Sequence, residues 1–327
     1  MQLVSCNGVL SPLKLIKYGV PQGSILGPLL FILYINDLPN VSSKLFFILF
    51  ADDTNVFNSH SSIEMLINET NIELEKVTDW FQTNKLTLNL DKTNYILFRS
   101  YQKPPPITDT ILSIMGTPIT QVQSCKFLGV YVDQHLSWNE HISNISGKIA
   151  KNLGILSRIS RLLPSHIRST LYYTLIYPYL SYCNIVWACA YKSNLTKLHI
   201  LQKRAVRFIA QIPYGAHTKS KFLIHKILKV DQIREVQIGI FMYRYLHNQL
   251  PSTFKDFFQL NINIHSYSSR NLGSLHIPFA RTNTRLSSIQ CTGPRCWNNI
   301  PLSIRSAPSL NHFKREWSTY ILHRDPA

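Results

Sequence analysis

The sequence predicts an α+β fold, in which a mixed first part with a sheet and packed helices precedes a helical second part. Up to His135, short apolar runs lie between turn residues, as strands do, and from Leu136 onward apolar residues recur at helical spacing. The charge changes at the same place. Residues 1–135 carry 9 basic and 11 acidic side chains, whereas residues 136–327 carry 25 basic and 6 acidic ones.

These patterns divide the chain into three segments: residues 1–135 (mixed), 136–250 (basic and helical) and 251–327. The last segment is rich in Ser, Asn and Pro, and we expect a loosely built module with one closing helix over Leu310 to Leu322. No apolar run reaches membrane-spanning length, and the first residues lack the layout of a signal peptide. We therefore expect an intracellular protein, in the nucleus or the cytoplasm, with no membrane partner.

The first segment begins with a short strand expected over Lys14 to Val20, which leads into a Gly- and Pro-containing turn over Gly19 to Gly23. Ser24 can cap the next helix, Ile25 to Leu38. This helix is apolar on nearly all sides, which predicts burial against a sheet. Next, Lys44 to Phe57 predicts a strand, a tight turn at Ala51-Asp52-Asp53-Thr54 and a second strand.

A long helix follows, because apolar or small residues recur at alternating steps of four and three: Ile63, Ile67, Thr70, Leu74, Val77 and Phe81. Ser61 or Ser62 can cap it. Alternating leucines predict a strand over Leu86 to Leu90, and a second is expected over Asn94 to Phe98. Pro104 to Pro106 predict a stiff linker, and Ile111 to Val132 predicts two or three short strands.

Four helices are expected in the second part, over Ile142 to Arg158, Ser165 to about Ala190, Asn194 to Gln211 and Gln232 to His247. The net charge of the whole chain is +17, with +19 on residues 136–327 and −2 on residues 1–135. Such asymmetry favours a polyanionic partner over a membrane surface, because the basic segments do not form one long amphipathic helix. The six scattered cysteines match no common zinc pattern and are expected to be reduced thiols.

The adjacent carboxylates of Asp52 and Asp53 are the strongest chemical signal. Two like charges at a hairpin tip repel each other, and a divalent cation removes that repulsion. Carboxylate oxygens are hard ligands of the kind that Mg²⁺ prefers, and phosphoryl transfer uses such ions. On its own, however, an Asp-Asp turn is more often a solvated hairpin tip.

The surrounding motifs give the pair its context. Gly19-Val20-Pro21-Gln22-Gly23-Ser24 with the following helix to Pro39, and then Phe50-Ala51-Asp52-Asp53-Thr54, resemble motifs B and C of reverse transcriptases. Leu88-Asn89-Leu90-Asp91-Lys92-Thr93 resembles motif D, and Phe127-Leu128-Gly129-Val130 resembles the primer grip, motif E. The order of the four motifs is that of the family.

Finer features resemble the non-LTR retrotransposon branch, in particular jockey-like elements. They are the phenylalanine before Ala-Asp-Asp, the run Leu128 to Asp133 with Trp138 after it, the Tyr-rich stretch Leu171 to Trp187, Gln202-Lys203-Arg204-Ala205, and Gly293 to Pro301. The resemblance implies a partial palm, an antiparallel sheet with packed helices over residues 1–135, then a basic helical thumb over 136–250 and a small C-terminal module. It also implies RNA-directed DNA polymerase activity on an RNA template and a DNA primer, with deoxynucleoside triphosphates as substrates and two Mg²⁺ ions.

Roles for single residues follow from the resemblance. Asp52 and Asp53 would hold the metals, with Asp52 the more direct ligand, and Lys92 would donate a proton to the leaving pyrophosphate. Template and nucleotide would meet Pro21, Gln22, Gly23 and Ser24. The primer would be held at Leu128 and Gly129. The backbone of the nucleic acid would be contacted by Lys148, Lys151, Arg158, Lys203, Arg204 and Arg207.

The chain also departs from the family pattern. The family has a third metal carboxylate in motif A, upstream of motif B, whereas none of residues 1–18 is Asp or Glu. We therefore expect a fragment that lacks motif A and the fingers and is inactive alone. One alternative is a non-catalytic nucleic-acid-binding remnant that uses the basic half. A weaker one is a group II intron maturase or a retron enzyme, against which the helical tail argues.

Overall fold

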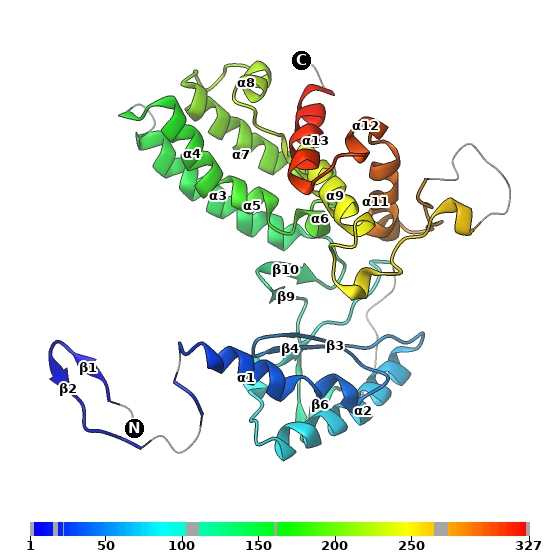
Figure 1. Cartoon of the computed structure of the whole chain (residues 1–327). Helices are drawn as coiled ribbons and strands as arrows, with labels where there is room; N and C mark the ends of the chain where they lie inside the picture. The colour runs from blue at the N-terminus through cyan, green and yellow to red at the C-terminus, as the bar shows by residue number, and fades with distance from the viewer. Residues whose placement is uncertain are drawn as a thin grey trace. The chain divides into compact units, whose positions relative to one another are not determined.

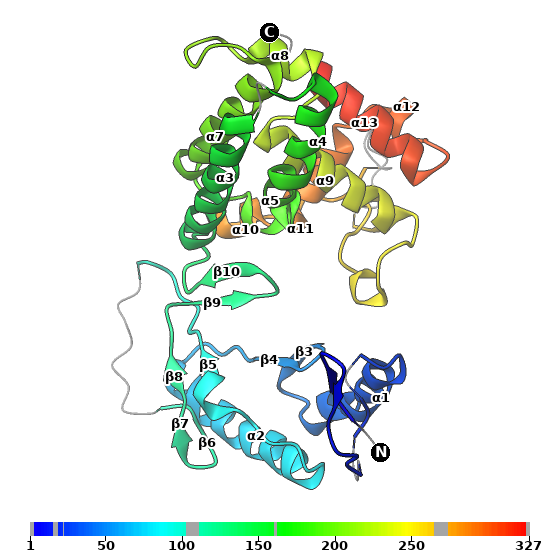
Figure 2. The ribbon, with the colours of Figure 1, turned by 90° about the vertical axis from the view of Figure 1, so that its left-hand side faces the viewer.

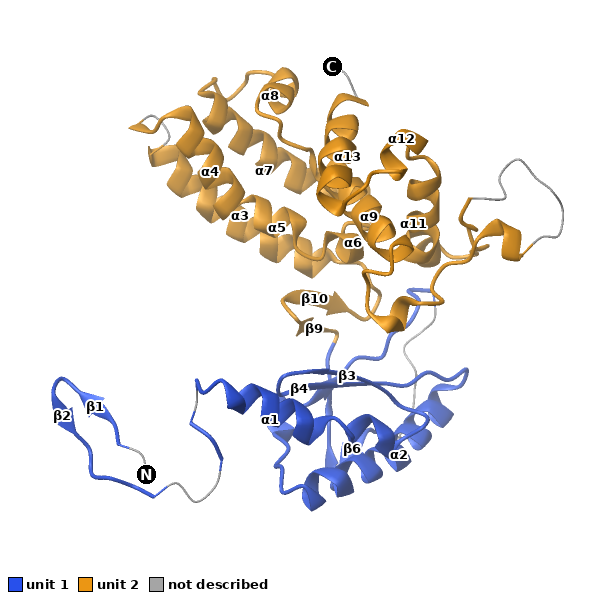
Figure 3. Cartoon of the chain, in the orientation of Figure 1, with its two compact units in different colours: residues 1–122 blue, residues 123–327 orange. Residues whose placement is uncertain are grey.

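The computed structural model describes residues 3–15, 19–21, 23–102, 111–159, 162–264 and 274–324. The chain forms two compact units, residues 1–122 (unit 1) and residues 123–327 (unit 2), which are coloured separately in Figure 3. Each is described by itself below. The mixture of helices and small sheets confirms the α+β class.

Unit 1 combines short strands with two longer helices (Figure 1). Its elements are β1 (Ser5–Cys6), β2 (Val9–Leu10), α1 (Leu26–Ile35), the 3-10 helix η1 (Leu38–Val41), β3 (Phe46–Phe50), β4 (Asp53–Phe57), α2 (Ile63–Thr83), η2 (Leu90–Lys92), β5 (Asn94–Tyr95), β6 (Ser113–Ile114), β7 (Thr117–Pro118) and β8 (Thr120–Gln121). Strands β1–β2, β3–β4 and β6–β7 pair antiparallel, and β5 pairs parallel with β8.

The core of unit 1 lies between the β3–β4 hairpin and α2. The stripe predicted on α2 is confirmed, because Ile67, Leu74, Val77 and Phe81 are buried. Val77 and Phe81 pack with Leu38 and Leu45. One face of the hairpin covers this cluster with Phe47, Leu49 and Val56. The hairpin is thereby fixed to α2, which positions its tip.

Two expectations for unit 1 are wrong. Helix α1 is not buried, since of its residues only Ile35 is, and Leu33 remains 65 % exposed. One face of the β3–β4 hairpin packs in the α2 cluster, while Phe46 and Phe50 on its other face stay exposed, so α1 does not cover that face either. Leu86 to Leu90 form no strand, because no neighbouring strand pairs with them in the described residues, although Leu86 and Leu88 still pack against the cluster. The predicted linker Pro104 to Pro106 and part of the strand expected over Lys14 to Val20 lie outside the described residues.

Unit 2 begins with a hairpin and continues as helices. Its elements are β9 (Ser124–Phe127), β10 (Val130–Asp133), α3 (Asn139–Ile159), α4 (Ser165–Leu175), α5 (Tyr177–Ser181), α6 (Asn184–Trp187), α7 (Lys192–Ala210), α8 (Lys219–Ile224), α9 (Val230–Leu246), η4 (Ser252–Phe254), η5 (Asn261–Asn263), α10 (Asn283–Ser287), α11 (Ile289–Asn298), α12 (Leu302–Arg305) and α13 (Leu310–Arg324). Helices α3 and α7 lie side by side (Figures 1 and 2).

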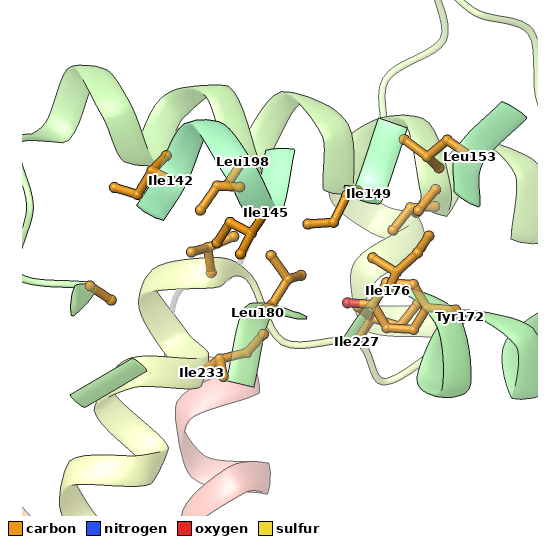
Figure 4. Close-up of a cluster of buried hydrophobic side chains, with 14 of the residues drawn as sticks. Ile142, Ile145, Ile149, Leu153, Tyr172, Ile176, Leu180, Leu198, Ile227 and Ile233 are labelled. Carbon is orange, nitrogen blue, oxygen red and sulfur yellow. The ribbon is translucent and has the colours of Figure 1, made fainter. Parts of the chain in front are cut away.

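Two apolar clusters stabilise unit 2. The first joins α3, α4, α5, α7 and the start of α9, with Ile149, Tyr172, Leu180 and Leu198 fully buried (Figure 4). The second joins α9 to α11, α12 and α13 around Phe313 and Trp317. Helix α9 contributes to both clusters, so the helices after residue 250 pack on the preceding helical segment.

Two expectations for unit 2 need correction. The single helix predicted over Ser165 to Ala190 is three helices, interrupted at Ile176 and at Cys183. Pro178 has no amide hydrogen and fits only the first turn of α5, and Cys183 has a left-handed backbone with φ of +50°. The tail is also better packed than its composition indicates, because Trp297, Phe313 and Trp317 are buried in it. In the described residues, no helix combines the length and apolar character that a bilayer span requires.

Candidate functional site

The two adjacent aspartates lie at the tip of the β3–β4 hairpin, as predicted. Phe50 pairs with Asp53, so Ala51 and Asp52 form a two-residue turn. Ala51 takes a left-handed conformation with φ of +50°, which costs an alanine roughly 1–2 kcal/mol. Asp52 and Asp53 are both exposed. The strained turn therefore presents two carboxylates to solvent on a base that is packed against α2.

The donor chemistry of this tip fits a hard divalent cation, and the number of donors is low. Two carboxylates supply oxygen ligands of the type that Mg²⁺ prefers. Among the described residues, no group of three or more His, Cys, Asp or Glu side chains is close enough to hold a metal ion. Two carboxylates alone leave most coordination positions of such a cation to be filled by water, substrate or another carboxylate.

The Gly- and Pro-containing loop before α1 lines an open groove with Phe31 and Tyr34. Pro21 and Gly23 are exposed, and Gln22 lies outside the described residues. Ser24 lies one residue before Ile25, the N-cap position of α1, and its Oγ accepts a hydrogen bond from the Gly27 amide at 3.1 Å, so it bonds the first turn from just outside the predicted cap position.

Lys92 ends the short helix η2 and is exposed. Its amide donates to the Asn89 side chain at 3.2 Å, which orders the turn. In the part of the chain that the structure describes, the Lys92 ammonium forms no ion pair, and neither aspartate of the hairpin tip is bonded to it.

Leu128 and Gly129 form the two-residue turn between β9 and β10, in unit 2. Both have left-handed backbones, with φ of +44° and +86°. Tyr182 contacts this turn, because its hydroxyl donates to the Leu128 carbonyl at 2.6 Å. The sequence alone does not predict this contact. The two residues are 54 positions apart, and only a Tyr-rich stretch marks the segment.

The six basic residues predicted to contact nucleic acid lie on two neighbouring helices and differ in availability. Lys148, Lys151 and Arg158, on α3, are exposed. Lys203, Arg204 and Arg207, on α7, are partly buried. The Arg207 Nε donates to the Ala216 carbonyl at 3.1 Å, and its guanidinium lies over the Tyr214 ring.

The cations of α3 are therefore exposed, whereas those of α7 are partly buried and one of them, Arg207, is held by contacts within the unit. The first turns of the two helices lie close together, because the Asn194 side-chain Nδ2 donates to the Asn139 Oδ1. Unit 2 as a whole contains 26 basic and 7 acidic residues, a net charge of +19. Such a unit attracts polyanions.

The structure thus assembles the predicted residues in two sets. Asp52, Asp53, Lys92 and the loop around Gly23 belong to unit 1, and Leu128, Gly129 and the basic residues belong to unit 2. Within unit 1, the aspartates are neighbours by virtue of the hairpin turn.

Comparison with known proteins identifies relatives for both units. Residues 4–132 match the family model described as "Reverse transcriptase (RNA-dependent DNA polymerase)". An "RNA-directed DNA polymerase from mobile element jockey" of Drosophila melanogaster is 27 % identical over 241 residues, which cover 70 % of this chain and 25 % of the relative. The jockey polymerase of Drosophila funebris is 26 % identical over 71 % of this chain and 26 % of its own length.

A third relative, the "Probable RNA-directed DNA polymerase from transposon X-element" of Drosophila melanogaster, is 29 % identical over 48 % of this chain and 17 % of its own length. The chain thus spans about a quarter or less of the length of these curated relatives. No solved structure matches the chain.

Proposed function

We propose that this chain is a jockey-like member of the reverse transcriptase family, which its matches to the family model and to the jockey polymerases support, and that it serves RNA-directed DNA synthesis by two-metal nucleotidyl transfer. The observation that carries the proposal is the hairpin tip, where Asp52 and Asp53 stand side by side within the segment that matches the family model. Unit 1 would be part of the palm, the basic helices up to residue 250 the thumb, and residues 251–327 a C-terminal module.

In this proposal Asp52 and Asp53 hold the catalytic Mg²⁺ ions. Bound divalent ions offset the charge that develops on the attacking and leaving oxygens of phosphoryl transfer. The exposed position of both carboxylates at a turn supports this role, because ligands from other chain segments and from substrate can complete the coordination.

The other residues of unit 1 would bind and orient the nucleotide. The loop Pro21, Gln22, Gly23 and Ser24 would meet template and incoming deoxynucleoside triphosphate, with Gly23 allowing close backbone approach at its φ of +84°. Lys92, exposed and without an ion pair in the described residues, would donate a proton to the departing pyrophosphate.

Unit 2 would hold the RNA template and the DNA primer. The Leu128–Gly129 turn would contact the primer, and Lys148, Lys151, Arg158, Lys203, Arg204 and Arg207 would contact phosphates. Its net charge of +19 supports this assignment, because phosphate contacts give sequence-independent affinity.

The polypeptide of these 327 residues is expected to extend no primer by itself, since no third carboxylate lies close enough to Asp52 and Asp53 to share a metal ion in the described part of the chain. A primer-extension assay on the purified chain with Mg²⁺ measures this. Deoxynucleotide incorporation by the wild-type chain would contradict the expected inactivity. If that incorporation disappears in Asp52→Ala, the proposed metal-binding role of Asp52 would still stand.

Metal binding at the hairpin tip tests the proposal on the chain itself. Mn²⁺, a paramagnetic substitute for Mg²⁺, should broaden the amide resonances of residues 50–54 selectively. Asp52→Asn with Asp53→Asn should remove the broadening, while the control Asp91→Asn, at another exposed turn aspartate, should keep it. Equal broadening in wild type and the double variant would overturn the metal role.

A second candidate function is a non-catalytic nucleic-acid-binding protein built from the basic unit. The charge of unit 2 favours it independently of the aspartates. The two candidates differ in the metal experiment, since a pure nucleic-acid-binding role requires no Mn²⁺ at the hairpin tip.

A further inference from the structure

The turn between β9 and β10 has a costly backbone. A two-residue hairpin loop with positive φ at both positions favours Asn and Gly, yet the first position is Leu128, with φ of +44°. A left-handed conformation costs such a residue roughly 1–2 kcal/mol. Such a conformation persists only where surrounding contacts hold it in place.

Tyr182 supplies that contact. Its hydroxyl donates to the Leu128 carbonyl at 2.6 Å, and its ring lies 3.4 Å from the position that a Cβ on Gly129 would occupy. One side chain thus fixes one residue of the turn by a hydrogen bond and lies against the other. Tyr182 as a residue is nevertheless 53 % exposed, so this is a surface contact and not a core one.

Tyr182 is itself held on a rigid base. Its amide donates to the Pro178 carbonyl at 2.9 Å, and its carbonyl accepts from the indole of Trp187 at 2.7 Å. Trp187 is fully buried in the core of unit 2. The next residue, Cys183, is left-handed with φ of +50°, which ends α5 and begins α6. The hydroxyl position is therefore set by the helical core.

The far end of the hairpin is anchored to the same unit. The Asp133 carboxylate accepts hydrogen bonds from the amides of His135, Ser137 and Trp138, the last at 2.8 Å. Helix α3 begins directly after them, and Val130 of β10 packs in the first cluster of unit 2. The hairpin is consequently held by the helices at both ends.

We propose that Tyr182 is a positioning residue for the primer. This inference rests on the proposed function, in which the Leu128–Gly129 turn contacts the DNA primer strand. By donating to the Leu128 carbonyl, Tyr182 fixes the orientation of the peptide group between Leu128 and Gly129. It also gives that carbonyl oxygen a donor, which lowers its repulsion toward a nearby phosphate. Tyr182 acts through the turn and is not a catalytic residue.

Binding of the full chain to two RNA–DNA hybrids tests the inference. One hybrid has a recessed DNA 3′ end, and the other is blunt with the same duplex length; fluorescence anisotropy gives the dissociation constant of each. Wild type should prefer the recessed end. Tyr182→Phe removes one neutral hydrogen bond and should reduce this preference by roughly 2- to 10-fold while leaving affinity for the blunt hybrid unchanged.

Two matched variants sharpen the test. Tyr191→Phe removes a hydroxyl from another exposed tyrosine of unit 2 and should keep the wild-type preference. Gly129→Ala strains the turn at its φ of +86° and should reduce the preference as Tyr182→Phe does.

The outcomes separate this inference from the proposed function. If wild type shows no preference for the recessed end, the primer role of the turn fails, and the inference fails with it. If wild type discriminates and Tyr182→Phe discriminates equally, only the inference is overturned. Tyr182 then has a structural role only. In that case Tyr182→Phe would lower the melting temperature, and it would lower the affinity for both hybrids to the same extent.

Discussion

At the scale of single residues, the turns between β3 and β4 and between β9 and β10 each contain a non-glycine residue in a left-handed conformation, Ala51 and Leu128. The turns between β1 and β2 and between β6 and β7 share this feature at Asn7 and Met115, so the backbone conformation alone does not mark a functional site. The Asp52–Asp53 turn could be predicted from sequence, since turn residues and strands flank it. The support of Leu128 by Tyr182 could not, because it depends on a contact across the fold.

A buried histidine near the β9–β10 hairpin makes this region sensitive to acid. His141 is 3 % exposed, its Nδ1 accepts from the Tyr131 amide at 3.4 Å, and its buried Nε2 has no hydrogen-bond partner among the described residues. Burial lowers the pKa of His141, and Lys148 lowers it further. Below the ordinary histidine value of about 6.5, the unfolded chain takes up a proton that the folded chain does not, so stability falls as the pH falls.

Calorimetry of the unit 2 transition at pH 7.5, 6.5 and 5.5 checks this prediction. The melting temperature should drop on acidification, and His141→Phe should make the drop smaller. A residual slope should remain, because burial also lowers the pKa values of His199 and His225. The exposed His166→Phe is the control, and a drop that His141→Phe leaves unchanged would contradict the account.

At the scale of elements, periodicity predicted helices wherever one face is buried. Helices α2, α3, α7, α9 and α13 agree with their predicted positions to within a few residues. Helix α1 formed as predicted, but its burial was wrong, because apolar composition gives no information on which surfaces cover a helix. Leu86 to Leu90 alternate like a strand, yet a strand also needs a partner, and local sequence does not supply one.

Two glycines in helices test the packing of unit 2. A Cβ on Gly239 of α9 would overlap the Trp317 indole of α13, whereas a Cβ on Gly147 of α3 would meet nothing within 4 Å. Gly239→Ala should therefore destabilise unit 2 by roughly 1–3 kcal/mol through overpacking. Gly147→Ala should stabilise it by up to about 1 kcal/mol, because alanine favours the helix. Urea unfolding gives both values, and equal effects would contradict this packing of α9 on α13.

At the scale of the whole molecule, the two compact units differ in charge. Unit 1 carries 8 basic and 10 acidic residues, and unit 2 carries 26 and 7. The separation of a near-neutral carboxylate-bearing unit from a strongly basic one suits a protein that holds metal and nucleotide in one part and nucleic acid in the other. This division was visible in the sequence, because charge counts need no tertiary contacts.

The salt dependence of nucleic-acid binding measures the contribution of α3. Lys148→Ala with Lys151→Ala removes two exposed cations and should lower the slope of log affinity against log salt by roughly 1 to 2, uniformly across sequences. The control, Lys14→Ala with Lys85→Ala, removes two exposed cations of unit 1 and should leave the slope unchanged. An equal decrease of the slope in both double variants would show that binding depends on net charge and not on the exposed cations of α3.

The central claim is that the Asp52–Asp53 tip is a polymerase metal site, and a chimera tests it most directly. Residues 4–132 would replace the aligned segment of the Drosophila melanogaster jockey polymerase, and Mg²⁺-dependent incorporation of deoxynucleotides on an RNA template would be measured. The chimera should incorporate nucleotides, and Asp52→Asn and Asp53→Asn should each abolish incorporation while binding of the template–primer persists. A folded, template-binding chimera that incorporates nothing, or one whose incorporation survives both substitutions, would contradict the claim.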